Sequence, residues 1–101
     1  MRKAKVYNFG MPAGLLIEDN DKYFFEYFDD YSGPPISLTM PVKKTQFSFN
    51  EFPPFFDGLL PEGNQLDALL RQSKIDKNDL FSQLLIVGND LVGSVTVEKF
   101  E

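Results

Sequence analysis

The apolar residues of this sequence change their spacing near residue 50, and this change most constrains the fold. In the first third they alternate with polar residues or form short runs, which is typical of β-strands. After Asn50 they recur every three or four residues, which is the spacing of a helix face. The sequence therefore predicts an α+β fold, in which a small antiparallel sheet is covered by about three short helices.

Several stretches predict the strands of that sheet. They are Lys3–Phe9, Leu15–Ile17, Tyr23–Phe28 and a carboxyl-terminal strand around Val95 and Val97. Asp19, Asn20 and Asp21 favour a turn between the second and third, so we expect an antiparallel meander. Both sides of the aromatic run Tyr23–Phe28 are mostly apolar, so we expect both to be covered. A further extended segment is expected over Ile36–Val42.

The helical part of the sequence predicts three segments. The first begins at about Asn50, holds its two prolines in the first turn and ends at Pro61. The second is expected over Gln65–Ser73 with Asn64 as its N-cap. The third is expected to start with Asp76 as N-cap and to end just before Gly88. Its buried stripe is predicted to contain Leu80, Phe81, Leu84 and Leu85.

Composition predicts one domain over residues 1–101 in a reducing compartment. Hydrophobic residues make up 43% and charged residues 25% of the chain, which is typical of globular proteins. There is no Cys, and no apolar stretch has the length of a signal peptide or a membrane span, so we expect a cytoplasmic protein without a membrane partner. The net charge of −5 opposes a phosphate backbone, so direct nucleic-acid binding is not expected.

The residues offer little for catalysis or for cofactors. Without His or Cys the chain cannot build a Ser-His-Asp triad, a Cys-His dyad or an imidazole metal site. Gly58 and Gly63 have the glycine spacing of a P-loop, but the following Lys and hydroxyl are missing. Asp19 and Asp21 fit a hairpin turn better than a calcium loop. We therefore expect no cofactor, no metal and no enzyme, and the remaining alternative is acid–base chemistry through Glu26 or Asp57.

Two segments carry a family resemblance that spans nearly the whole chain. Pro35–Val42 and Phe52–Gly63, followed by a leucine-rich helix and by Gly88–Val95, resemble the amino-terminal subdomain of the HipA family of bacterial serine/threonine kinase toxins. In that family the subdomain precedes a larger kinase body, which binds ATP and magnesium and carries the catalytic Asp. No segment here corresponds to that body, so the resemblance does not carry kinase activity over to this chain.

The resemblance implies a stand-alone version of the subdomain, as found in tripartite HipBST toxin–antitoxin operons. There a HipS-like protein is the antitoxin, a HipT-like kinase is the toxin, and a HipB-like protein binds operator DNA. The leading expectation is an antitoxin that binds and neutralises a HipT-like kinase, with a HipB-like protein as a further member of the complex. The alternatives are a structural or activating subunit, or an amino-terminal fragment, of a HipA-like kinase toxin.

A domain that evolved within a longer chain keeps an apolar face, and that face becomes an interface when the domain is separate. The segment after Asn50 has more apolar side chains than one short helix can bury on one side. The residues predicted to bind the partner are Phe52, Phe55, Phe56, Asp57, Leu59, Leu60, Pro61 and Glu62. For Phe55 and Phe56, a place in the domain's own core is the alternative.

Overall fold

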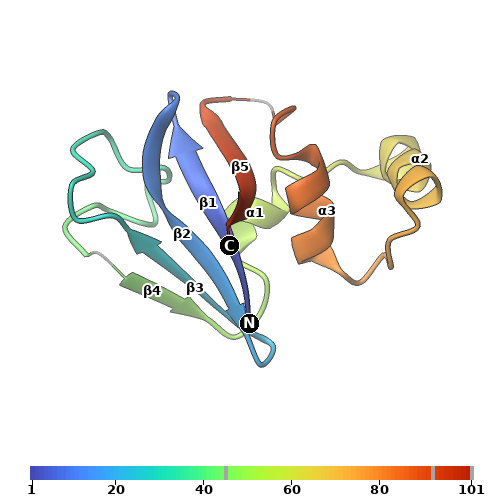
Figure 1. Cartoon of the computed structure of the whole chain (residues 1–101), viewed down its shortest axis with the longest axis horizontal. Helices are drawn as coiled ribbons and strands as arrows, with labels where there is room; N and C mark the ends of the chain where they lie inside the picture. The colour runs from blue at the N-terminus through green and yellow to red at the C-terminus, as the bar shows by residue number, and fades with distance from the viewer. Residues whose placement is uncertain (45, 92, 101) are drawn as a thin grey trace.

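The computed structural model describes residues 1–44, 46–91 and 93–100, and these form an α+β domain (Figure 1). Its elements are β1 (Arg2–Asn8), β2 (Met11–Asp19), β3 (Lys22–Tyr27), β4 (Gln46–Phe49), α1 (Pro54–Asp57), α2 (Gly63–Ser73), α3 (Leu80–Val87) and β5 (Val95–Phe100). The five strands form one sheet in the order β4-β3-β2-β1-β5, and every described pairing is antiparallel. The predicted fold class, a meander with an added carboxyl-terminal strand and three short helices, is confirmed.

Two tight hairpins set the register of the first three strands. Phe9 and Gly10 join β1 to β2, and Asn20 and Asp21 join β2 to β3, all four with positive φ. Positive φ at both loop residues gives the turn twist that matches twisted antiparallel strands. The predicted turn around Asn20 is thus confirmed, and it brings β2 directly against β3.

One face of the sheet forms the core. Its buried side chains alternate with less buried ones in Ala4 and Val6 of β1, Phe25 and Tyr27 of β3, and Val95 and Val97 of β5. α1 and α3 complete the core with Phe56, Phe81 and Leu84. The opposite face was also expected to be covered, but Glu26 is exposed there and Phe24 is half-buried. That part of the prediction is wrong, because the helices contribute to one face only.

The segment between β3 and β4 does not form the extended stretch predicted over Ile36–Val42. Instead Ser37 and Met40 make a single bridge across a turn. The hydroxyl of Tyr27 anchors this turn, since it donates to the Met40 carbonyl at 2.6 Å and accepts from the Ile36 N–H at 3.0 Å. A buried tyrosine hydroxyl thus satisfies backbone groups that a strand would have paired with a neighbour.

The described helices differ from the predicted ones mainly at their ends. α1 is four residues long and begins at Pro54, because the preceding Pro53 holds an extended backbone with ψ of 131°. α2 begins at Gly63 with Glu62 as N-cap, so Asn64 is not the cap. α3 is capped by Asp79, which accepts a hydrogen bond from the Ser82 N–H at 3.2 Å.

The predicted cap at Asp76 is wrong for a local reason. Its side chain accepts from the Asn78 N–H at 2.8 Å and forms a separate turn over residues 76–78, before the cap at Asp79. The predicted stripe of α3 is confirmed for Phe81 and Leu84, which are buried, while its other two leucines are half-buried. Gly88 lies at the carboxyl end of α3, as expected.

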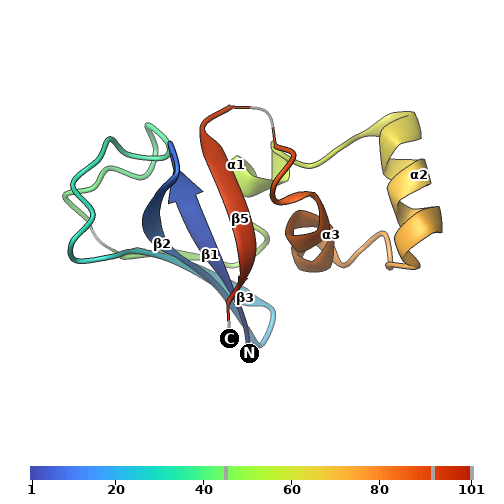
Figure 2. The ribbon, with the colours of Figure 1, turned by 45° about the horizontal axis from the view of Figure 1, so that its top comes forward.

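α2 stands apart from the rest of the domain. Figures 1 and 2 both show it at the end of the molecule farthest from the sheet, beyond α3. None of its described residues is buried, although leucines recur along it at helical spacing. The described helices include none with the length and apolar character that crossing a membrane requires.

Candidate protein-binding surface

The segment predicted to bind a partner is divided between core and surface. Phe52, Phe56 and Leu60 are buried, at 8%, 0% and 8% exposure, and recur every fourth residue. The Phe56 ring lies 5.9 Å from the Phe25 ring of the sheet, and the Phe52 ring lies 5.4 Å from that of Tyr23. These three side chains therefore hold α1 and the turns around it on the sheet.

The remaining members of the segment face outward. Phe55, Leu59 and Pro61 are half-buried, and Asp57 and Glu62 are exposed. We call these five residues the α1 surface. Phe55 contacts Phe56 edge to face with ring centroids 5.1 Å apart, so a buried ring fixes the orientation of the exposed one. The binding role of all eight predicted residues stays a prediction, and the structure leaves these five accessible to a partner.

Hydrogen bonds keep this surface rigid although α1 is short. The N–H groups of Leu59 and Leu60 donate to the carbonyls of Phe56 and Asp57, both at 3.1 Å. Gly58 donates to the Pro54 carbonyl at 3.0 Å. These three N–H groups are therefore paired within the segment, which favours a surface that binds a partner with little reorganisation.

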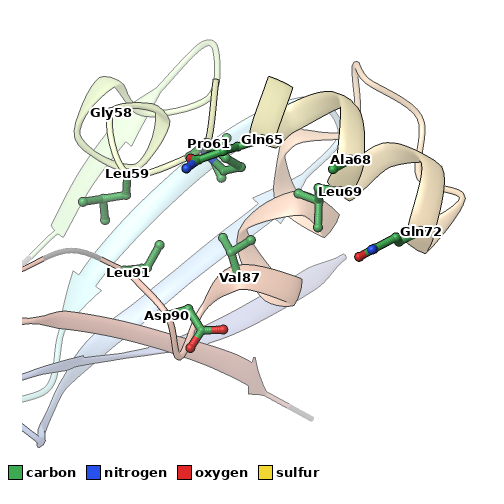
Figure 3. A pocket seen from close by; sticks show the side chains of 11 residues that line it. Gly58, Leu59, Pro61, Gln65, Ala68, Leu69, Gln72, Val87, Asp90 and Leu91 are labelled. Atoms are coloured by element: carbon green, nitrogen blue, oxygen red, sulfur yellow. The ribbon is translucent and has the colours of Figure 1, made fainter. Parts of the chain in front are cut away.

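An open groove extends from the α1 surface to the other two helices (Figure 3). It has a volume of about 710 Å³. Leu59, Leu60 and Pro61 form one side, Ala68 and Leu69 of α2 form the second, and Val87 with Leu91 at the end of α3 forms the third. Sequence reasoning found the first side only, because the spacing of the α2 leucines does not tell whether the chain itself covers them.

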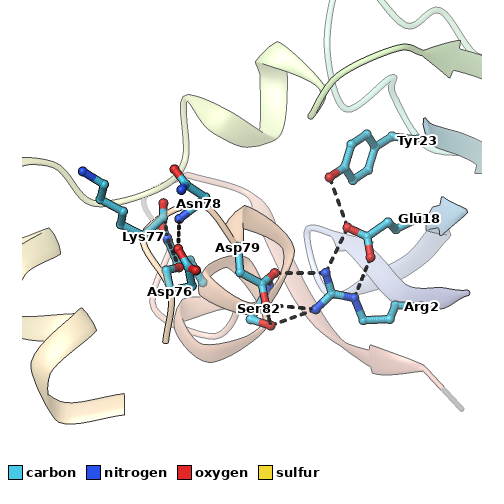
Figure 4. A network of polar contacts seen from close by, with 9 residues as sticks. Arg2, Glu18, Tyr23, Asp76, Lys77, Asn78, Asp79 and Ser82 are labelled. Carbon is cyan, nitrogen blue, oxygen red and sulfur yellow. Dashed lines mark hydrogen bonds and ion pairs between the residues drawn. The ribbon is translucent and has the colours of Figure 1, made fainter. Parts of the chain in front are cut away.

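A polar network on another part of the molecule joins α3 to the sheet (Figure 4). The Arg2 guanidinium binds Glu18 on β2 and Asp79 at the start of α3, and it donates to the Ser82 hydroxyl at 2.9 Å. Glu18 also accepts a hydrogen bond from the Tyr23 hydroxyl at 3.1 Å. All these groups are partnered by one another, so the network acts as a structural clamp.

The clamp shifts the pKa of its members. Hydrogen bonds from Arg2 hold the pKa of Glu18 below its ordinary value, against the opposing effect of burial. Burial alone would raise the pKa of Asp79, but hydrogen bonds from Arg2 and Ser82 outweigh it and keep that pKa low. The same contacts raise the pKa of Arg2, so the guanidinium stays charged.

The described residues offer no support for acid–base chemistry at the two carboxylates considered from sequence. Glu26 and Asp57 are both exposed, whereas a catalytic carboxyl needs desolvation or a close partner to raise its pKa. Within the described ranges there is no cluster of acidic side chains that would hold a metal ion. The fold and the α1 surface thus define a small α+β domain with an accessible apolar patch beside acidic side chains.

Comparison with known proteins places this domain in a family. Residues 4–98 match the family described as the HipA N-terminal domain. The chain therefore belongs to the HipA N-terminal domain family, and the domain is not the catalytic part of HipA. The solved N-terminal domain of HipA toxin has the same fold, with a TM-score of 0.80 and 32% identity over 100% of this chain and 94% of that one.

Relatives contain this domain in two contexts. An uncharacterised protein of Haemophilus influenzae is 34% identical over 98% of this chain and 93% of its own length. Two Sinorhizobium fredii kinase candidates, Y4mE and Y4dM, are 32% and 31% identical over 72% and 92% of this chain. The matched region spans 17% of Y4mE and 25% of Y4dM, so both contain much more than this domain.

Proposed function

We propose that this chain binds a HipT-like serine/threonine kinase and acts as its antitoxin. One observation carries the proposal: related domains occur as a fraction of proteins named as kinase candidates and as nearly the whole of the H. influenzae relative. A surface that contacts the rest of a long chain is open when the domain is separate. The proposed partner therefore corresponds to the part that the longer relatives add to this domain.

The α1 surface is the proposed contact. Phe55, Leu59 and Pro61 supply apolar area that is already partly ordered by the core below it. Ordered aromatic and apolar side chains bind at low entropic cost, and they form the centre of many protein interfaces. Asp57 and Glu62 flank this area and select for positive charge on the partner.

Binding at this surface would suppress the kinase by disturbing the alignment of its reacting groups, without any chemical step on this chain. Phosphoryl transfer depends on the alignment of nucleotide, metal and acceptor, so a bound domain that occupies the cleft or holds the lobes apart slows the reaction. In this proposal the chain contributes no catalytic group and no cofactor ligand.

Co-expression with a HipT-like kinase from the same genome tests the proposal. The expected result is that toxicity falls, that the two proteins co-purify, and that the purified complex phosphorylates substrate more slowly than free kinase. A kinase that gains activity on adding the chain would instead support a structural or activating subunit. A kinase that stays equally toxic and does not co-purify would contradict both the antitoxin proposal and the subunit alternative.

A HipB-like DNA-binding protein is the proposed third member of the complex. Adding it to the purified pair and measuring the mass of the assembly tests this part separately. The expected mass is that of a complex containing all three proteins. A mass that stays at that of the pair would limit the proposal to two proteins.

A further inference from the structure

The groove behind the α1 surface is apolar but has one charged side chain in its lining. That residue is Asp90, which follows α3 and lies below Val87 and Leu91 in Figure 3. Opposite it, Ala68 and Leu69 of α2 point into the groove, while Gln65 and Gln72 extend the same helix face. Since no described residue of α2 is buried, this face has no full partner within the described chain.

Acidic side chains adjoin this apolar lining on its α1 and α3 sides. Asp57 and Glu62 are exposed and lie next to the first side of the groove in the sequence, which Leu59 and Pro61 line. The sequence contains no Lys or Arg from residue 45 to 70 or from 78 to 98, while Arg71 and Lys74 are exposed at the carboxyl end of α2. No lining residue that the structure describes is basic. Charge complementarity thus favours an occupant with Lys or Arg on the flanks of an apolar side.

The backbone of the groove walls decides the conformation of the occupant. The N–H groups of Leu59, Leu60 and Asp90 donate to the carbonyls of Phe56, Asp57 and Val87, at 3.1, 3.1 and 2.8 Å. An extended peptide in the groove would find these three N–H donors already used, so its C=O groups beside them would lose water without replacement. A helix satisfies its own backbone and needs only side-chain contacts, which are what these walls offer.

We propose that the groove receives an amphipathic helix of the kinase, with its apolar side against Leu59, Leu69 and Leu91 and a Lys or Arg paired with Asp90. This inference rests on the proposed function and deepens it, because it names the part of the kinase that binds. It extends the contact from the α1 surface across the groove to α2. Helix α2 then gains the partner that its apolar face lacks in the described chain.

Two substitutions with matched controls test the inference on the full chain. Leu69→Glu places a charge in the apolar lining, and Asp90→Lys reverses the groove's charge. Leu38→Glu and Asp30→Lys make the same chemical changes at exposed positions outside the groove, Leu38 being 97% exposed. We expect each groove variant to weaken binding to the purified kinase at least tenfold, and each control to bind like the wild type.

Further measurements keep the outcomes distinct. Urea unfolding shows which variants are folded. If Asp90→Lys does not fold, Asp90→Asn, which removes the charge without reversing it, is used in its place. If the wild type itself does not bind the kinase, the proposed function fails. If the wild type binds and folded groove variants bind equally well, only the groove inference is overturned. Hydrogen exchange of the complex should protect a helical, base-containing kinase segment, and protection of an acidic or extended segment would also overturn it.

Discussion

The Arg2 guanidinium lies 2.9 Å from the carboxylate of Asp79, 77 positions along the sequence, and fixes the start of α3 against β1. The same guanidinium binds Glu18 through two bonds of 2.6 and 2.9 Å. Bidentate arginine–carboxylate pairs of this kind are stronger than ordinary surface ion pairs, although solvent screening at a partly exposed position weakens them. Arg2→Ala should therefore lower the free energy of unfolding by about 1 to 2 kcal/mol in urea titrations.

Arg71→Ala is the matched control for this prediction. Arg71 is exposed on α2, and its guanidinium donates a long hydrogen bond of 3.5 Å to the Asp67 carbonyl. Its removal should change the free energy of unfolding by less than about 0.5 kcal/mol. Equal losses in the two variants would show that the clamp contributes nothing beyond an ordinary surface arginine.

The clamp also predicts how stability depends on pH. The pKa values of Glu18 and Asp79 are lower in the folded state than their ordinary values of 4.5 and 3.8. The stabilisation is therefore complete above the ordinary values, and it is lost as the pH falls through the lower folded values. The free energy of unfolding should decrease below about pH 5. The decrease should be shallower in Arg2→Ala, and identical pH profiles for the two proteins would contradict the assignment.

Much of the fold follows from the sequence, because its strands are local and strongly patterned. The alternation in β1 and the turn residues Asn20 and Asp21 correctly predict a meander, and the stripe in α3 correctly places Phe81 inside. Strand β4 was not predicted. Its alternation of Phe47 and Phe49 with polar residues is a usable signal, but four residues are too few to stand out.

The helix starts could not be settled from sequence, since several acids compete to cap the same helix. Asp76 and Asp79 are both suitable caps, and the selection of Asp79 depends on its contact with Arg2 from the other end of the chain. The division of the α1 segment into buried and half-buried rings also depends on contacts with a distant part of the chain. Spacing groups Phe52, Phe55 and Phe56 together, whereas only the position of the sheet decides which rings are covered.

Gly88 provides a test of how closely α3 approaches β5. A side-chain carbon on Gly88 would lie 1.9 Å from the Val97 carbonyl oxygen, which is backbone and cannot rotate away. The Gly88 carbonyl also accepts a hydrogen bond from the Val97 N–H at 2.9 Å. The end of α3 therefore covers part of β5, which is an edge strand of the sheet. Gly88→Ala should cost about 3 kcal/mol of unfolding free energy.

Gly58→Ala is the control, because Gly58 has a similar backbone with φ of −64°, compared with −55° for Gly88. A carbon added there would meet its nearest neighbours at 3.5 Å, which is ordinary contact. The free energy of unfolding of this variant should lie within about 0.5 kcal/mol of the wild-type value. A Gly88→Ala protein as stable as Gly58→Ala would mean that α3 can move away from β5 without loss.

The adjacent rings Phe55 and Phe56 separate stability from binding. Phe56 is fully buried, so Phe56→Ala should lower the free energy of unfolding by about 3 to 5 kcal/mol. Phe55 is half-buried, so Phe55→Ala should lower it by only about 1 kcal/mol. If the α1 surface is the kinase contact, Phe55→Ala should nevertheless weaken kinase binding at least tenfold. Urea unfolding and titration calorimetry with the purified kinase measure the two effects on the same samples.

Phe56→Leu controls for loss of structure in this comparison. It keeps most of the buried volume and should cost about 1.5 kcal/mol, a loss similar to that of Phe55→Ala. Because Leu at position 56 stays under the surface, this variant should bind the kinase within about threefold of the wild type. Equal weakening by Phe56→Leu and Phe55→Ala would attribute the loss of binding to destabilisation. Unchanged binding of folded Phe55→Ala would remove Phe55 from the contact, since a half-exposed ring at the centre of an interface cannot be deleted without cost.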